Sequence, residues 1–213
     1  MSQRIDALIC PRWTIPVEPE VEVREDHCLA IDKGRILDLL PRAEASQRFA
    51  PDVTHERPDH VLIPGLVNAH THAAMTLMRG FGDDLSLERW LNDRIWPTEM
   101  RLVSPEFVAD GARLAITEML RGGITCFADM YFYPERAAEV AVESGIRMVV
   151  GMIAIEFPTP WASDAAECRA RLRTDPWVQA QKPFNRSIVG MGCMEKKGWL
   201  WLTEPGGAPG IGG

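Results

Sequence analysis

Residues 63–72 read IPGLVNAHTH, and this stretch decides how the chain is interpreted. An apolar run over residues 61–70 turns polar at Asn68, which predicts a strand whose carboxyl end carries His70 and His72. Side chains two positions apart in a strand point to the same face, so the two imidazoles are expected to converge. Two converging imidazoles suit one divalent metal ion such as zinc, although an H-x-H pair also occurs as two half-exposed histidines.

Helices and strands alternate after this run. The longest helix has complete boundary signals, with Ser104 as N-cap, Pro105 at the first helical position and Gly122 after its end. The sequence predicts helices over residues 86–95, 105–121, 134–144 and 163–173, and strands over residues 124–128 and 146–155. This alternation indicates βαβ units and a parallel sheet, and strands that are apolar throughout are typical of a sheet covered on both faces.

The two flanks differ from this central region. Residues 1–62 hold short apolar stretches broken by turn formers, and residues 27–40 predict a hairpin that turns at Gly34, so we expect a β-rich unit with few helices. From about residue 166 the alternation fades, and no stretch resembles the next strand of a βα series. We therefore divide the chain into residues 1–62, residues 63–165 and a tail over residues 166–213 that is either divergent or the product of a shifted reading frame.

Composition excludes several classes of protein. The chain has 213 residues, a net charge of −7, 46% hydrophobic residues and 25% charged residues, which are ordinary values for a globular protein. These values argue against disorder and against a nucleic-acid binder with a basic face, and no apolar run is long enough to cross a membrane. The five cysteines are odd in number and form no C-x-x-C pair, which argues against a disulfide framework and favours a cytoplasmic protein.

The motifs resemble those of a known family. Residues 64–72 are similar to the first-strand signature of the amidohydrolase superfamily of metal-dependent hydrolases. Further matches are residues 73–80 (AAMTLMRG), 84–91 (DLSLERWL), 95–99 (IWPTE) and 118–132 (EMLRGGITCFADMYF). Together they resemble the 5-methylthioadenosine/S-adenosylhomocysteine deaminases and their chlorohydrolase-like relatives over residues 1 to about 165. The resemblance implies an α/β fold, namely the first ~3 βα units of a TIM barrel with an N-terminal portion of a β-sandwich.

The resemblance also implies a chemistry. His70 and His72 would bind Zn²⁺ (or Fe²⁺) together with a His and an Asp from later strands, and the metal would make hydroxide available for attack at C6 of adenine, with release of ammonia. Glu99 matches the carboxylate that binds the ribose hydroxyls, and Trp90 matches an aromatic wall of the nucleoside pocket. Alternatively, Glu99 is solvated and Trp90 is part of the core. Asp129, at a strand end, either orients a group near the metal or caps the following turn.

The chain departs from the family in one respect. No histidine follows His72, so the third metal ligand and the proton-shuttling acid and base of the family are absent. We therefore expect an incompletely ligated metal and a truncated chain that is inactive alone. Two alternatives stay open: the chain is a relative that acts on s-triazines or cyclic amidines, or it is a non-catalytic fragment with a binding or dimerisation role. The expected partner is a small-molecule nucleoside, with no nucleic acid and no membrane, and a homo-oligomer is left open.

Overall fold

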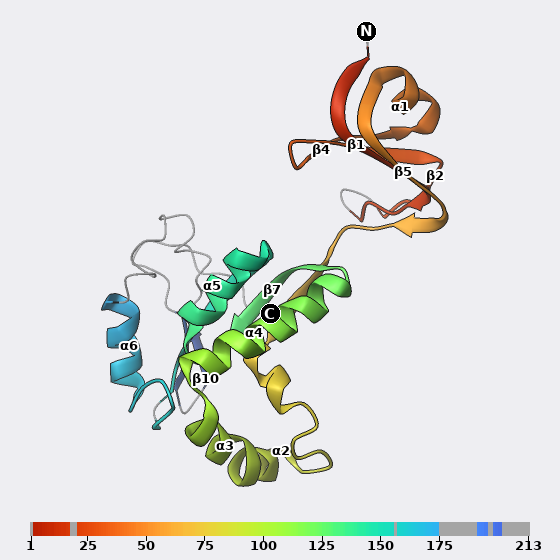
Figure 1. Cartoon of the computed structure of the whole chain (residues 1–213). Helices are drawn as coiled ribbons and strands as arrows, with labels where there is room; N and C mark the ends of the chain where they lie inside the picture. Colours follow the sequence, from red (N-terminus) through yellow and green to blue (C-terminus); the bar gives the residue numbers. More distant parts are fainter. Residues whose placement is uncertain (1, 18–20, 156, 175–190, 196–197, 202–213) are drawn as a thin grey trace. The chain divides into compact units, whose positions relative to one another are not determined.

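The chain divides into two units, residues 1–64 and residues 65–213 (Figure 1). The computed structural model describes residues 2–17, 21–155, 157–174, 191–195 and 198–201. Within these ranges no helix is both long enough and apolar enough to span a lipid bilayer.

The first unit is a five-stranded sheet with one short helix. Its elements are β1 (Gln3–Thr14), β2 (Arg24–Glu25), β3 (His27–Asp32), β4 (Arg35–Pro41), α1 (Arg42–Arg48) and β5 (Phe49–Leu62). The strand order is β2-β1-β3-β4, and β5 pairs with β1 in parallel. The predicted hairpin is confirmed as β3 and β4, with Lys33 and Gly34 at φ 50° and 71° in the turn. Positive φ at both turn positions matches the right-handed twist of the two strands.

A disulfide joins Cys10 to Cys28, although the odd number and the spacing of the cysteines argued against a disulfide framework. Ile9 pairs with Leu29 in the antiparallel contact between β1 and β3, which places the two cysteines opposite each other with Cα atoms 4.3 Å apart. The strand register, rather than the spacing of the cysteines along the chain, brings them together. The expectation of a cytoplasmic protein therefore loses the support that it drew from the cysteines.

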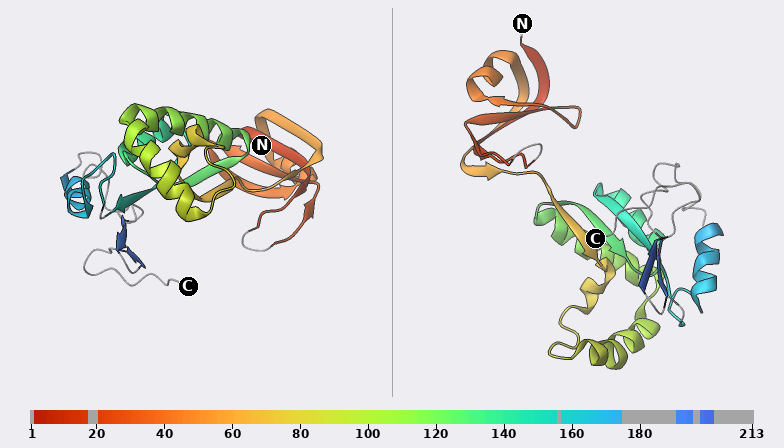
Figure 2. Two further views of the ribbon diagram at one scale, coloured as in Figure 1. Left: turned by 90° about the horizontal axis from the view of Figure 1, so that it is seen from below. Right: turned by 180° about the vertical axis from the view of Figure 1, so that it is seen from behind.

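The second unit is an α/β unit whose sheet has the order β10-β9-β8-β7-β6. Its strands are β6 (Leu66–Thr71), β7 (Ile124–Met130), β8 (Arg147–Ala154), β9 (Met191–Glu195) and β10 (Gly198–Trp201). Strands β6 to β9 are parallel, and β10 is antiparallel to β9. The connections hold α4 (Pro105–Arg121), α5 (Pro134–Ser144) and α6 (Ala165–Thr174), and both further views show α4 running beside β7 (Figure 2).

The boundaries of the helices follow their local signals. The Ser104 hydroxyl accepts the backbone N–H of Phe107 at 3.2 Å, which caps α4 as predicted. Gly145 ends α5 at φ 70°, a conformation that glycine adopts without a steric penalty. The helix expected over residues 86–95 is longer than predicted and runs through α2 (Leu87–Arg89), the π-helical η2 (Trp90–Ile95) and α3 (Trp96–Leu102). The pattern of apolar residues does not reveal the π-helical turn. Hydrogen bonds in such a turn join residues five apart instead of four, and the apolar pattern does not record this difference.

Two expectations about strands were wrong. The apolar run over residues 61–70 is not one strand, because β5 ends at Leu62 and β6 begins at Leu66. Nor is β6 covered on both faces: it lies at the edge of the sheet, and Leu66 and Val67 are 50% and 66% exposed. Apolar composition alone cannot tell a central strand from an edge strand, since the neighbouring strand decides this.

A strand does follow residue 166. Met152, Ile153 and Ala154 of β8 pair in parallel with Met191, Gly192 and Cys193 of β9, and α6 lies between these strands along the chain. The expectation that no further βα element occurs there was therefore wrong. The segment is short and contains glycine, so its periodicity is weak, and pairing with the edge of β8 defines it as a strand.

Candidate metal centre

His70 and His72 converge at the carboxyl end of β6. Their ring centroids lie 5.2 Å apart, and the ring planes meet at 80°. Two imidazoles that share one tetrahedral zinc ion, each through a nitrogen about 2.0 Å from the metal, have centroids roughly 5 Å apart. The spacing and orientation of the pair therefore fit two ligands of one metal ion.

The ring of His72 is fixed by β7. Its Nδ1 lies 2.5 Å from the carbonyl oxygen of Met130, so Nδ1 carries the proton and donates it. Nε2 is left with a lone pair, which is the form that binds a metal. Burial of the ring lowers the pKa of His72, the bond to Met130 opposes this, and the nearby His70 lowers the pKa further. His72 is therefore neutral near pH 7, as a metal ligand must be.

Asp129, the residue before Met130, fixes the backbone directly after His72. Its Oδ1 accepts the backbone N–H of Ala73 at 2.8 Å, and the residue is 3% exposed. Burial raises the pKa of Asp129 to about 7, although amide hydrogen bonds from Ala73 and Met130 act in the opposite direction. Contacts of both kinds considered for this strand-end aspartate are present, because it holds the turn after His72 through Ala73 and also accepts the backbone N–H of Met130, the next residue.

The turn after His72 is also fixed by α4. The short 3₁₀ helix η1 (Ala73–Met78) packs against α4, and the two backbones approach closely at Gly111. A Cβ atom at Gly111 would lie 2.5 Å from the carbonyl oxygen of Ala74, closer than any real contact. Glycine is therefore required at this position because two backbones meet there.

Glu99 is buried and lies near the histidine pair. It belongs to α3, is 5% exposed, and accepts the phenolic O–H of Tyr131 at 2.7 Å on Oε1. The Tyr131 ring centroid lies 6.0 Å from that of His72, so Tyr131 links the carboxylate to the histidine pair. Burial raises the pKa of Glu99, and the hydrogen bond from Tyr131 partly offsets this increase.

Tyr131 belongs to the candidate site but is not among the residues predicted from the sequence. It belongs to the motif at residues 118–132, but its spacing from Glu99 gives no indication of contact. Its position directly after the strand-end residues Asp129 and Met130 was the available signal, because residues at the carboxyl ends of parallel strands gather at one edge.

A cavity of about 90 Å³ adjoins Glu99. Its lining residues come from α3, the segment after β7 and the segment after β8: Trp96, Glu99, Met100, Phe132, Ile155, Phe157, Pro158, Thr159 and Pro160. Trp90, the other residue predicted to contact substrate, does not line it. The Trp90 indole N–H donates to the carbonyl of Phe81 at 3.3 Å, which fixes the preceding loop. Tyr131 thus connects Glu99 to His72, and Trp90 contacts the backbone at Phe81.

The histidine pair is short of a full zinc ligand set. Within the described ranges, no three His, Cys, Asp or Glu side chains form a group that would hold a metal ion. Protein zinc sites use three or four such ligands. Among the described residues, His70 and His72 can therefore supply two of the ligands of a metal ion.

Residues 61–199 match the model of the amidohydrolase family, and the chain belongs to this family. It is 44% identical over 158 residues to a 5-methylthioadenosine/S-adenosylhomocysteine deaminase of Saccharophagus degradans, covering 74% of this chain and 35% of that protein. A 5'-deoxyadenosine deaminase of Methanospirillum hungatei is 39% identical over 159 residues, covering 74% of this chain and 34% of that protein. The chain thus spans about a third of the length of these curated relatives. The resemblance that the motifs indicated is confirmed.

Solved structures agree with this assignment. A zinc-bound adenosine deaminase from Xanthomonas campestris superposes with a TM-score of 0.81 at 45% identity, covering 91% of this chain and 43% of that one. The zinc complex of atrazine chlorohydrolase from Arthrobacter aurescens TC1 gives a TM-score of 0.66 at 19% identity, covering 83% and 44%. The second similarity shows a shared fold alone. The first is more similar to this chain than the second in both sequence identity and TM-score.

Proposed function

We propose that this chain carries the metal-binding and ribose-binding part of a metal-dependent hydrolase that deaminates 5'-substituted adenosines. In this proposal residues 63–165 are the first ~3 βα units of a TIM barrel, and residues 1–62 contribute to a β-sandwich. The observation that carries the proposal is the convergent pair His70 and His72, held by β7 beside the buried Glu99. The names of the similar proteins supply the substrate class.

His70 and His72 would bind the metal ion, and zinc is the metal of the similar adenosine deaminase. A metal ion bound there supplies a Lewis acid that makes a water nucleophile available near neutral pH. The protein's own contribution is to fix the ligands: Met130 selects the tautomer of His72, and Asp129 anchors the turn that follows it. Such supporting contacts strengthen metal binding by orienting the ligands before the metal arrives.

Glu99 would bind the ribose hydroxyls. Its Oε1 accepts the hydrogen bond of Tyr131, and among the described residues none donates a hydrogen bond to Oε2. A carboxylate oxygen can accept two hydroxyl protons, so one oriented carboxylate suits a vicinal diol. Trp90 would form an aromatic wall of the nucleoside pocket, as the family motif implies.

The 213-residue chain alone would not turn over substrate. The acid and base of the family are not among its residues by the motif match, and the histidine pair supplies two metal ligands where three or four are usual. Activity would therefore belong to a protein of the full length of the relatives, to which this chain contributes its part of the site.

Two measurements test this proposal. The first is ammonia release from 5'-methylthioadenosine by the zinc-supplemented chain, and we expect none. The second is the same assay on a chimera in which residues 1–165 replace the matching part of the Saccharophagus degradans relative. We expect an active chimera that loses activity by at least a hundredfold on substitution His72→Ala or Glu99→Gln. An active isolated chain, or a chimera indifferent to both substitutions, contradicts the assignment.

A further inference from the structure

Two tyrosines follow β7, and their hydroxyl groups hold two different segments of the chain. Tyr131 donates its O–H to Oε1 of Glu99 at 2.7 Å. Tyr133 donates its O–H to the carbonyl oxygen of Pro160 at 2.6 Å. The first acceptor is a side-chain carboxyl group on α3, and the second is a backbone carbonyl in the segment after β8. The bond from Tyr131 is therefore the one that acts on a candidate binding residue.

The ring of Tyr131 is fixed by its neighbours. The residue is 4% exposed, and its ring centroid lies 4.9 Å from that of Phe132 and 6.0 Å from that of His72. Met130, the residue before it, pairs with Gly151 of β8 in the parallel sheet. A ring packed among buried side chains next to a paired strand holds its hydroxyl group in one place. Tyr131 can therefore direct the group to which it donates.

The carboxyl group of Glu99 needs such a direction. Glu99 is 5% exposed, so its side chain is packed, but the last torsion of a glutamate is broad and roughly two-fold. Packing of the side chain therefore leaves the plane of the carboxyl group undetermined. A hydrogen bond to one carboxyl oxygen fixes this plane and with it the direction of the other oxygen. The bond from Tyr131 to Oε1 thus determines where Oε2 points.

The direction of Oε2 matters for a ligand that carries hydroxyl groups. Hydrogen bonds weaken steeply as the donor, proton and acceptor depart from a line, and a charged acceptor strengthens them. A carboxylate that is oriented before the ligand arrives also avoids the entropic cost of ordering it on binding. An oriented Glu99 should therefore distinguish a sugar with a hydroxyl group at the contact from a sugar without one.

From these contacts we infer that Tyr131 is a positioning residue for recognition of the sugar: it fixes the plane of the Glu99 carboxyl group, so that Oε2 accepts hydroxyl protons of the ribose. The inference rests on the proposed function, because it takes Glu99 as the ribose-binding residue. It goes further by assigning the preference for ribose over deoxyribose to the hydroxyl group of Tyr131, which acts through Glu99.

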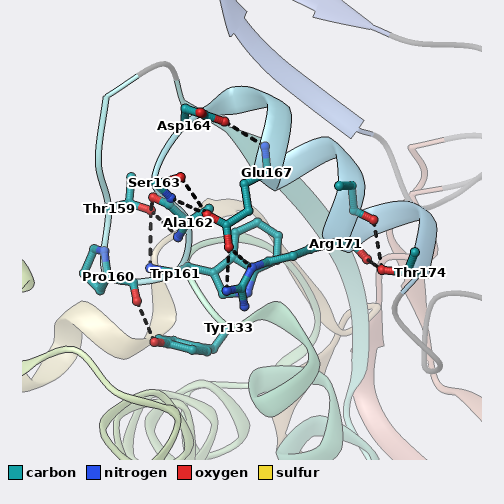
Figure 3. A network of polar contacts seen from close by, with 11 residues as sticks. Tyr133, Thr159, Pro160, Trp161, Ala162, Ser163, Asp164, Glu167, Arg171 and Thr174 are labelled. Atoms are coloured by element: carbon teal, nitrogen blue, oxygen red, sulfur yellow. Dashed lines mark hydrogen bonds and ion pairs between the residues drawn. The ribbon is translucent and has the colours of Figure 1, made fainter.

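Tyr133 offers a matched control in the same loop (Figure 3). The turn that contains its acceptor, Pro160, is closed by other bonds as well. The Thr159 hydroxyl accepts the N–H of Ala162 at 3.0 Å, and the backbone N–H of Thr159 donates to the carbonyl of Ala162 at 2.8 Å. Loss of the Tyr133 hydroxyl therefore leaves this turn closed and removes no hydrogen bond of Glu99.

Binding measurements on the 213-residue chain test the inference without requiring turnover. Affinities for adenosine and 2'-deoxyadenosine are measured by ligand-observed NMR titration at pH 8 in buffer containing zinc. The two ligands differ in one hydroxyl group, so the ratio of their affinities reports the contact of that group and does not change when part of the protein is unfolded. One hydrogen bond to a carboxylate predicts that the unmodified chain binds adenosine roughly tenfold more tightly.

Variants then assign this preference to the hydroxyl group of Tyr131. Tyr131→Phe should lower the preference for adenosine to about threefold or less, because the carboxyl group of Glu99 is then free to rotate. Tyr133→Phe should leave the preference within about twofold of its original value. An equal fall in the two variants would overturn the inference, since it would show a general effect of the loop.

A double-mutant cycle separates positioning from a structural effect. Glu99→Gln should abolish the preference, and Tyr131→Phe should then change it no further, because Tyr131 acts through Glu99. The same fall on Tyr131→Phe in both backgrounds would overturn the inference.

A second measurement leaves Tyr131 unchanged. A tyrosine hydroxyl proton that is buried and held by a carboxyl group exchanges slowly with water, as protected amide protons do. The chain has two tyrosines, so NMR of Tyr133→Phe with labelled tyrosine observes Tyr131 alone. We expect a slowly exchanging proton whose exchange Glu99→Ala accelerates at least tenfold. Exchange that is indifferent to Glu99→Ala would overturn the inference.

Failure of the inference differs from failure of the proposed function. A preference for adenosine that is present in the unmodified chain and unchanged in Tyr131→Phe would overturn the inference and leave the role of Glu99 intact. Equal affinities of the unmodified chain for the two nucleosides, or binding of neither, would overturn the ribose-binding role of Glu99 and the inference with it.

Discussion

The hydrogen bond from Tyr131 to Glu99 can be tested by a single-atom change, Tyr131→Phe. The substitution keeps the aromatic ring beside His72 and removes the hydroxyl that lies 2.7 Å from Oε1 of Glu99. The residue remains buried, because the original side chain is 4% exposed. The change therefore isolates one donor to a buried carboxylate.

Its magnitude depends on the charge of Glu99. A hydrogen bond to a charged group contributes about 1.5–3 kcal/mol, against about 0.5–1.5 kcal/mol for a neutral pair. Burial already raises the folded-state pKa of Glu99, and loss of the Tyr131 donor raises it further. The native state then binds a proton more tightly than the unfolded chain, so stability falls as pH rises from the ordinary glutamate pKa toward the raised one. The destabilisation should thus be small near pH 4.5 and larger by about 1 kcal/mol near pH 8.

Tyr133→Phe is the matched control, because the Tyr133 hydroxyl donates to the neutral carbonyl of Pro160 at 2.6 Å. Urea unfolding of both variants and the original chain, followed by circular dichroism in metal-free buffer, gives the change in unfolding free energy at each pH. We expect about 1 kcal/mol from Tyr133→Phe at both pH values. A loss from Tyr131→Phe that is the same at both pH values would refute the argument, since it would show that Glu99 is not charged in the folded chain at pH 8.

Three further outcomes are expected. Gly111→Ala should destabilise the chain by more than about 2 kcal/mol in thermal unfolding, although alanine is favoured over glycine by about 1 kcal/mol in an open helix; a stabilised variant would contradict the close approach to η1. Cys10→Ser should cost about 3 kcal/mol because it opens the loop closed with Cys28, and non-reducing peptide mapping should recover the linked pair; unlinked peptides would contradict the pairing. His72→Ala should weaken zinc binding in a competition titration by at least tenfold, whereas His60→Ala, in the other unit, should leave it unchanged; equal losses would point to nonspecific binding.

Much of the fold could be predicted because its signals are local. The caps of α4 and the glycine that ends α5 fix these helices through contacts within a few residues. The turn at Lys33 and Gly34 fixes the hairpin in the same way. The extension of the helix through η2 and the strand β9 were missed, since the first depends on a π-turn and the second on pairing with β8.

In the candidate site, too, local sequence determined some features and tertiary structure determined the others. The sequence by itself determined the alternation of helices and strands from α4 to β8. It also determined the convergence of His70 and His72, because side chains two residues apart in a strand share a face. Tertiary structure alone decided that Tyr131 reaches Glu99 across 32 residues and that Cys10 meets Cys28. It also decided that β6 lies exposed at an edge. The physical reason is that strand register and helix packing are set by pairing between distant segments, and no local pattern encodes which segments pair.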